Sequence, residues 1–230
     1  MKISVIIPTY CEVETIGKLI GHLKLYGGDK VAEIIVVDGQ SIDGTLEEAE
    51  KNNAIAVTAP VKGRAAQMNY GASLSLGEVL YFVHADSFPP STFADDILNA
   101  IREGFDFGRY RTKFDSHKWY LKINAWFTRF DWFICMGGDQ TLFITRTIFE
   151  KTGGFNPSMK IMEEYEFVQR ARLNHTYKVF SNSALVSARK YDTNSWWRVQ
   201  MANRKIVNMY KQGASQEQMS LAYKKMLNYR

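Results

Sequence analysis

Cysteine is scarce in this chain of 230 residues, which contains only Cys11 and Cys135. The two lie far apart, and neither belongs to a CxxC motif or to a Cys/His cluster. A disulfide framework or a structural zinc site needs more ligating side chains at closer spacing. We therefore expect neither feature in this protein.

Long hydrophobic runs are also missing. Residues 5–7 form the only apolar run before Pro8, which is too short for a signal-peptide core, and no later stretch reaches the length of a membrane span. We therefore expect the protein to stay in the cytoplasm. The chain also has no repeats or low-complexity tracts, and its hydrophobic content of 46% is ordinary for a globular protein. At this length we expect one domain.

Two common nucleotide-binding signatures do not occur. No GxGxxG follows the first apolar run, and no glycine-rich P-loop ending in lysine is found anywhere. The sequence therefore supports neither a dinucleotide-binding fold of that type nor a P-loop protein. A nucleotide bound by this chain must be held differently.

The net charge of +5 is distributed unevenly. Residues 187–230 contain nine Lys and Arg against two acidic residues, whereas the preceding part is slightly acidic. This basic excess favours an anionic partner near the C-terminal end, such as a phosphate or a lipid head group. Solvated helices are often basic without any specific partner, so the simpler interpretation also stands.

Strands and helices alternate along the first half of the chain. The apolar runs predict strands at 3–7, 32–37, 54–58 and 80–83, and helical spacing or turn signals predict helices at 13–23, 45–51 and 63–75. Loops of a few residues join them. This order predicts an α/β fold, with a mostly parallel central sheet flanked by helices and followed by C-terminal helices.

The second half continues less regularly. The patterns predict strands at 105–114, 141–145, 177–180 and 184–187, and helices at 91–103, 117–134, 146–152, 162–173, 195–210 and 215–229. The helix at 117–134 carries Trp119, Trp126 and other large apolar residues on one face. Such a face is usually core, but tryptophans with flanking cations are also typical of a helix that touches a membrane or an apolar acceptor.

Polar side chains follow the apolar run 80–83 directly, in the order His84, Ala85, Asp86. In an open α/β sheet, ligands bind just beyond the carboxyl ends of the strands. A carboxylate at that place suits a divalent cation held against a phosphate. An aspartate also caps turns, and this local motif alone does not decide between the two.

Other charged residues occupy comparable places. Asp38 ends an apolar run, where it suits contact with a base or ribose, or a simple Asp-Gly turn. Arg64 begins a helix, where it suits a diphosphate or plain solvation. Glu163 and Glu164 fall in the first turn of a helix, where the helix dipole favours them and where one of them also suits a general base.

Taken together, these segments resemble a known family. The series SVIIPTYCE, VVDGQSIDGT, KGRAAQMNYGA, LYFVHADS, GGDQTLFITRTIFEKTGGF and MEEYEF resembles the motifs of family 2 glycosyltransferases of the GT-A fold, over roughly residues 2–190. The sequence is most similar to the small, cytoplasmic bacterial branch with HAD at the metal motif. The resemblance implies a nucleotide-sugar donor, a divalent metal and inverting transfer to an acceptor hydroxyl. It divides the chain into a GT-A domain at 1–190, with a nucleotide-binding half at 1–114 and an acceptor half at 115–190, and a basic helical extension at 191–230.

The resemblance assigns roles residue by residue. The donor side is matched by Pro8, Thr9 and Glu12 under the nucleotide, Asp38 at the base, Arg64 near the diphosphate, and Ala85 with Asp86 at the metal motif. Arg189 and Lys190 are further candidates for the diphosphate. The acceptor side is matched by the loop Gly138, Asp139 and Gln140, and by Glu163 and Glu164 in place of a Glu-Asp pair. The second member of that pair is usually the base, which makes Glu164 our candidate.

Two residues depart from the family pattern. His84 replaces the first acid of the D-x-D motif, so Asp86 with His84 forms the candidate site for Mn²⁺ or Mg²⁺, and an imidazole ligand favours Mn²⁺. Glu164 replaces the usual aspartate and reaches one methylene further. From family habit we expect UDP as the nucleotide.

Other interpretations remain open at this point. One is a non-catalytic module that binds a sugar nucleotide or a membrane surface, and another is a nucleotidyltransferase, although PTYCEVETI is not the glycine-rich basic signature that such enzymes need. The expected partners are a nucleotide-sugar donor and a hydroxyl acceptor, for which a lipid-linked molecule is one option. No nucleic acid is expected. The candidate segments for peripheral contact with the inner face of the membrane are 117–134 and the basic tail.

Overall fold

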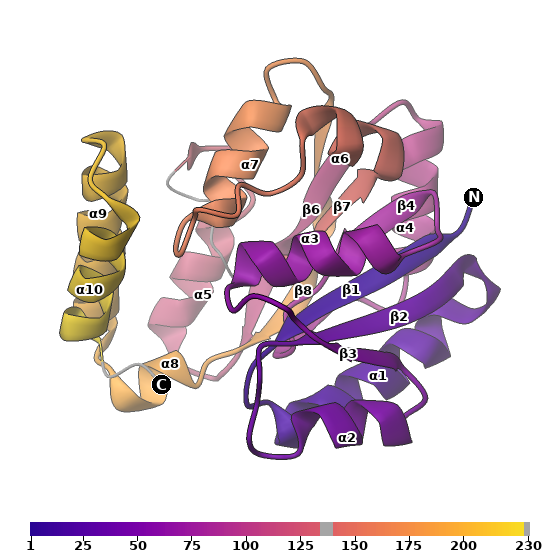
Figure 1. Ribbon diagram of the computed structural model, residues 1–230. Helices are drawn as coiled ribbons and strands as arrows, with labels where there is room; N and C mark the ends of the chain where they lie inside the picture. The colour runs from indigo at the N-terminus through magenta and orange to yellow at the C-terminus, as the bar shows by residue number, and fades with distance from the viewer. Residues whose placement is uncertain (134–139, 228–230) are drawn as a thin grey trace.

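A computed structural model describes residues 1–133 and 140–227. The first half has the predicted alternation (Figure 1). Its elements are β1 (Ile3–Thr9), α1 (Val13–Gly27), the 3-10 turn η1 (Gly28–Lys30), β2 (Val31–Asp38), α2 (Thr45–Lys51), β3 (Ile55–Thr58), α3 (Arg64–Leu74) and β4 (Val79–Phe82). Strands β3, β2, β1 and β4 lie side by side in that order and all run parallel.

The second half completes the sheet and adds helices. Its elements are β5 (Ser87–Phe88), α4 (Phe93–Arg102), β6 (Phe107–Asp115), α5 (Trp119–Phe127), β7 (Leu142–Thr145), α6 (Arg146–Thr152), α7 (Glu163–Ala171), β8 (Tyr177–Ser187), α8 (Lys190–Thr193), α9 (Trp196–Lys211) and α10 (Gln216–Met226). The eight-stranded sheet has the order β3-β2-β1-β4-β7-β6-β8-β5, in which β7 is antiparallel to both of its neighbours. The predicted α/β architecture, mostly parallel and with C-terminal helices, is confirmed.

Successive apolar side chains of the central strands point to opposite faces of the sheet, which explains why helices cover both faces. On β1, Ile3, Val5 and Ile7 pack with residues of α1 and α4, whereas Ile6 packs with α3 on the opposite face. Strand β4 alternates in the same way and is buried on both sides. Such strands read as continuous apolar runs, which is why they were predictable from the sequence.

Three details of the second half differ from the prediction. The helix expected over 117–134 ends at Phe127, because Arg109 on β6 donates hydrogen bonds to the carbonyl oxygens of Thr128 (2.9 Å) and Phe130 (3.1 Å) and so holds that backbone out of the helix. The two strands expected at 177–180 and 184–187 are one strand, β8, with an irregularity opposite Arg109 to Arg111. The two-residue strand β5 was not predicted.

In the described residues 117–133, most of the aromatic face is open to solvent, although Phe133 packs beside Tyr165 and Tyr210. Trp119 is 70% exposed, Trp126 46% and Trp132 56%. Trp197, at the start of α9, adds another exposed indole. Of the two interpretations of this face, the structure therefore disfavours the core.

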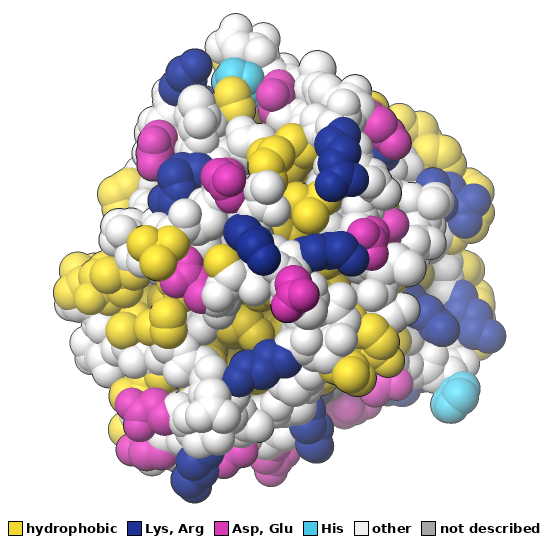
Figure 2. Space-filling view, turned by 90° about the vertical axis from the view of Figure 1, so that its right-hand side faces the viewer, with side chains coloured by type: hydrophobic (Ala, Val, Ile, Leu, Met, Phe, Trp, Pro, Cys, Tyr) yellow, Lys and Arg dark blue, Asp and Glu magenta, His cyan; other side chains and the backbone are white. Residues whose placement is uncertain are grey.

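Charge differs between the sides of the molecule. Figure 2 shows the side that lies to the right in Figure 1. Cationic and anionic side chains are interspersed on this side and do not form a large patch of either charge. The basic helices α9 and α10 stand at the left edge of Figure 1. They contact the body through Ile206, Val207 and Met219, which pack on Met159 and Met162 just before α7. The basic excess of the tail is thus placed beside the start of α7.

Close packing of α3 against the sheet gives a first prediction. A Cβ on Gly71 would lie 2.5 Å from Cγ2 of Ile6 and 2.9 Å from Cγ2 of Val37, so Gly71→Ala should destabilise the fold by about 1–3 kcal/mol. Gly21→Ala in α1 is the matched control, because no atom lies within 4 Å of that position, and helix propensity should leave it unchanged or stabilise it by up to about 1 kcal/mol. Urea unfolding measures both. Equal stability of the two variants would contradict the close packing.

Candidate active site

The carboxyl ends of β1, β2 and β4 meet at one rim of the sheet. Thr9 at the end of β1 is in register with Asp38 at the end of β2, and the chain leaves β4 toward His84 on the same side. Gln67 from α3 joins two of these ends, since its amide donates hydrogen bonds to the carbonyl oxygens of Thr9 and Val37, each 2.8 Å away. The rim therefore has a fixed shape.

Asp38 is buried at this rim and bonded to its own loop. Its carboxylate accepts hydrogen bonds from the backbone N–H of Ser41, at 2.7 Å, and from the Ser41 hydroxyl. Asp38 therefore stabilises the Asp-Gly turn that follows it, as one of the two interpretations of the sequence predicted. The predicted contact with a nucleotide base stays a prediction, and the hydrogen bonds to Ser41 fix the carboxylate in position for it.

Arg189 brings two of the predicted acids together. Its guanidinium donates to both carboxylate oxygens of Glu12, one of them at 2.7 Å, and lies 3.3 Å from Oδ2 of Asp86. Arg189 follows β8 and is 177 residues from Glu12 in the chain. This donor corner, which we define as Glu12, Asp86 and Arg189, thus places a cation between two carboxylates.

A second group of charges joins α7 to the same rim. Nε2 of His84 lies 2.9 Å from Oε1 of Glu164, and Nε of Arg64 lies 3.2 Å from Oε1 of Glu163. Both glutamates are buried although they stand in the first turn of a helix. Each therefore has its own cationic or titratable partner in the first half of the chain.

The pair of His84 and Glu164 holds its protons unusually tightly. Burial favours neutral imidazole, but the charge and hydrogen bond of Glu164 outweigh this and raise the pKa of His84 above its ordinary 6.5. For Glu164 the balance is different. Burial disfavours the charged carboxylate and raises its pKa, and this effect exceeds the opposing effects of His84 and Arg64. A raised pKa makes the carboxylate a stronger base in its ionised form. In the described part of the chain, Oε2 of Glu164 has no hydrogen-bond partner.

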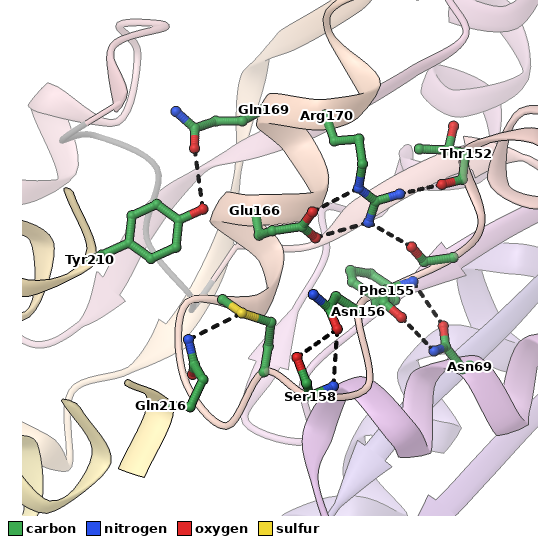
Figure 3. A network of polar contacts seen from close by, with 12 residues as sticks. Asn69, Thr152, Phe155, Asn156, Ser158, Glu166, Gln169, Arg170, Tyr210 and Gln216 are labelled. Atoms are coloured by element: carbon green, nitrogen blue, oxygen red, sulfur yellow. Dashed lines mark hydrogen bonds and ion pairs between the residues drawn. The ribbon is translucent and has the colours of Figure 1, made fainter. Parts of the chain in front are cut away.

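The segment before α7 is held from two sides, which fixes both glutamates. The Asn69 amide of α3 donates to the carbonyl of Phe155 at 2.7 Å and accepts from its N–H at 2.9 Å (Figure 3). Arg170 of α7 donates to both oxygens of Glu166 and to the carbonyl of Gly154, as Figure 3 also shows. Sequence reasoning did not single out this network.

A cavity of about 220 Å³ opens beside Glu164. Arg64, Glu163 and Glu164 form one side of it, and side chains of α9 and α10 form the other. A much smaller cavity, of about 20 Å³, lies between Glu164 and the predicted acceptor-side residue Gln140. The other two members of that loop, Gly138 and Asp139, lie outside the described residues.

The remaining predicted residues fall around these groups. Pro8 and Thr9 end β1, and Ala85 is buried between His84 and Asp86. Lys190 lines the larger cavity and does not belong to the donor corner with Arg189. Lys160, Asn203 and Lys224, which also line that cavity, were missed. Nothing in their spacing distinguishes them from other residues of basic amphipathic segments.

The implied metal fits the donor corner in one respect. No three His, Cys, Asp or Glu side chains of the described residues are grouped closely enough to bind a metal by themselves. The carboxylates of Glu12 and Asp86 nevertheless share one cationic group, so a divalent cation is electrostatically suited to the same place if donor phosphates supply further oxygens. His84 uses Nε2 for Glu164, which leaves Nδ1 for the predicted metal ligation.

Comparison with known proteins identifies the family. The model of the family described as "Glycosyl transferase family 2" matches residues 4–165, which is more than half of the chain. The chain belongs to glycosyltransferase family 2. The predicted resemblance is thereby confirmed. A dolichol-phosphate mannosyltransferase of Pyrococcus furiosus is 31% identical over 111 residues, which cover 46% of this chain and 32% of that protein. The chain thus spans only about a third of the length of this curated relative.

Solved structures support the fold of this family 2 member. One is S. aureus TarS 1–349 in complex with UDP-GlcNAc, with a TM-score of 0.64 and 20% identity over 81% of this chain and 58% of that chain. Another is the mannosyltransferase PcManGT from Pyrobaculum calidifontis in complex with GDP-Man and Mn²⁺, with a TM-score of 0.65 and 19% identity over 91% and 63%. At such identities the likeness shows the GT-A fold alone. Across residues 1–133 and 140–227, no helix has both the length and the apolar character needed to cross a bilayer.

The coupling of His84 to Glu164 predicts a reversal in titration. In metal-free wild-type protein the pKa of His84 should lie above 6.5. In Glu164→Gln it should lie below 6.5, because burial, which is the largest effect, and the charge of Arg64 then outweigh the weaker opposing charge of Asp86. NMR titration measures this, with His22, His117 and His175 as internal references.

The same coupling sets the pH dependence of stability. With a raised pKa, the folded state binds the His84 proton more tightly than the unfolded state, so this stabilisation is complete below pH 6.5 and is lost as pH rises through the folded pKa. In Glu164→Gln, where the pKa of His84 should lie below 6.5, this contribution should change sign, so that stability is lost as pH falls below 6.5. An unchanged His84 titration in Glu164→Gln would contradict the pairing.

Proposed function

We propose that this protein transfers a sugar from a nucleotide-diphosphate sugar to an acceptor hydroxyl, with inversion at the anomeric carbon and assistance from a divalent metal. The observation that carries the proposal is the placement of Glu164. Its buried carboxylate is held at one oxygen by His84, while Glu164 itself lines the larger cavity at the rim where the donor corner lies. A fixed base beside charged groups suited to phosphates is the arrangement that this reaction needs.

The donor side follows from the charges at the rim. A diphosphate leaving group gains negative charge as the bond to the sugar breaks, and cations preorganised around it lower the barrier. Arg64 and Arg189 are placed for this role, and Lys190 lines the adjoining cavity. Asp86, with Glu12 beside it, would hold Mn²⁺ or Mg²⁺, which when bound supplies further charge stabilisation to the diphosphate.

The acceptor side follows from Glu164. The carboxylate of Glu164 takes the proton of the acceptor hydroxyl as the hydroxyl oxygen forms a bond to the anomeric carbon. The bond from this carbon to the diphosphate oxygen breaks on the opposite side, and its electron pair stays with the leaving nucleoside diphosphate. His84 keeps the carboxylate oriented through Oε1. Attack opposite to the leaving group inverts the configuration.

UDP is the nucleotide that we propose, following the habit of the family. The two structural neighbours described above contain a uridine and a guanosine donor, so a donor screen must include both. The P. furiosus relative is named for dolichol phosphate, which supports a lipid-linked acceptor as one option.

Peripheral membrane contact is a further part of this proposal. It is supported by the exposed aromatic side chains of 117–133 and by the basic helices α9 and α10.

Asp86→Ala tests the donor corner. Removing this carboxylate should abolish the enhancement of UDP binding by Mn²⁺, because Glu12 alone remains and is paired with Arg189. Calorimetric titration with UDP, with and without Mn²⁺, measures the effect. Asp95→Ala is the control, since Asp95 is exposed on α4 and pairs with Lys30 at 2.8 Å. Mn²⁺-dependent affinity that survives in Asp86→Ala would count against the assignment.

Glu164→Gln tests the base. Donor binding should persist, while transfer should fall by about 10²–10⁴, which is the usual contribution of a positioned general base. Glu163→Gln is the matched variant at the neighbouring position and should mainly weaken diphosphate binding through its partner Arg64. Steady-state transfer rates and UDP titration separate the two. An active Glu164→Gln beside an inactive Glu163→Gln would assign the base to Glu163.

A further inference from the structure

The larger cavity is built by a part of the chain that the family match does not cover. The match ends at residue 165, whereas one wall of the cavity comes from Asn203 and Ile206 on α9 and from Ser220 and Lys224 on α10. The opposite wall contains Glu164. The C-terminal hairpin therefore closes a space directly beside the proposed base.

The charges around this space favour an anion. Four cationic side chains line it together with two carboxylates: Arg64, Lys160, Lys190, Lys224, Glu163 and Glu164. Arg64 forms an ion pair with Glu163 within the cavity. Lys160 forms an ion pair with Glu217, which lies outside the cavity lining, with 2.7 Å between Nζ and Oε1. Counted over the whole lining, cationic side chains outnumber carboxylates by four to two, and Lys190 and Lys224 are two of these four cations. This is the reverse of the donor corner, where carboxylates outnumber the guanidinium.

The neutral lining and the volume restrict the ligand further. Asn203, Ser220 and Tyr223 offer hydrogen-bonding groups, and Ile206 and Val207 offer an apolar patch. The volume of about 220 Å³ is many times the roughly 10–15 Å³ that one water molecule needs in a cavity, so a phosphate and the carbon atoms that carry it have room here. Ammonium groups and hydroxyls together are typical ligands of a phosphate.

We propose that this cavity binds the acceptor and that the acceptor carries a phosphate monoester next to the hydroxyl that is glycosylated. This rests on the proposed function and adds the substrate class. The phosphate contacts Lys224 and Lys190, and the hydroxyl reaches the carboxylate of Glu164. The hydroxyl proton passes to this carboxylate, the hydroxyl oxygen bonds to the anomeric carbon, and the electron pair of the broken bond leaves with the nucleoside diphosphate.

The experiment uses the full chain with UDP and Mn²⁺ at saturation, so that a phosphate cannot bind in the donor corner. Glycerol 3-phosphate, which combines a hydroxyl with a phosphate monoester, is titrated by calorimetry, and glycerol is the uncharged comparison. Lys224→Glu should weaken glycerol 3-phosphate binding about tenfold or more, the expected effect of losing one charge-assisted hydrogen bond. Lys225→Glu is the control, because Lys225 is the exposed next residue of α10 and does not line the cavity.

A second variant protects the test against misfolding. Ser220→Leu narrows the cavity without changing its charge and should also weaken glycerol 3-phosphate binding, while circular dichroism and UDP affinity stay as in the wild type. Failure of glycerol 3-phosphate to bind the wild type, or equal weakening by Lys224→Glu and Lys225→Glu, overturns the proposal. Failure of the wild type to bind UDP contradicts the proposed function instead, and glycerol 3-phosphate alone then still tests the cavity.

The phosphate can belong to a soluble molecule or to a lipid head group. Co-sedimentation with phosphatidylcholine vesicles that contain lysophosphatidic acid, whose head group is glycerol phosphate, distinguishes the sources. Binding to these vesicles that exceeds binding to pure phosphatidylcholine and is lost in Lys224→Glu assigns a lipid. Calorimetric binding of glycerol 3-phosphate without such vesicle binding assigns a soluble acceptor.

Discussion

The buried hydrogen bond between His84 and Glu164 is the interaction on which the site depends. It joins residues 80 positions apart, one after the end of β4 and one in the first turn of α7. A carboxylate buried without a partner is strongly destabilising, so the two elements must meet accurately. The Asn69 contacts to Phe155 and the Arg170 contacts to Glu166 serve this requirement, because they fix the segment that leads into α7.

Much of the fold was predictable because strands buried on both faces leave a continuous apolar pattern. The runs at 3–7 and 80–83 became β1 and β4 at the centre of the sheet. The helix at 117–134 was overestimated, since its end is set by Arg109, a residue on another element whose side chain captures the carbonyl oxygens. The pairing of β8 with β6 is likewise nonlocal, so one irregular strand gave the pattern of two short ones.

The positions of candidate site residues were more predictable than their contacts. Asp38 and Asp86 follow strand ends, and this local pattern places them at the rim. Which acid meets which cation is decided by tertiary structure. The sequence did not indicate that Arg189 would return to Glu12 and Asp86, or that Arg64 would select Glu163 and His84 would select Glu164. Like-charged neighbours in one helical turn look equivalent until their partners are known.

The two ends of the site carry opposite excesses of charge, and this has a consequence for the proposed reaction. In the donor corner a single guanidinium serves two carboxylates, so in the proposed reaction a divalent cation would occupy a place that already suits a cation. Arg189 would then be available to the diphosphate, whose charge would otherwise repel Asp86. In the cavity beside Glu164, cations exceed carboxylates. The proposed anionic acceptor would be attracted there and away from the donor corner, so the opposite charges would help to place the two substrates on opposite sides of the reacting carbon.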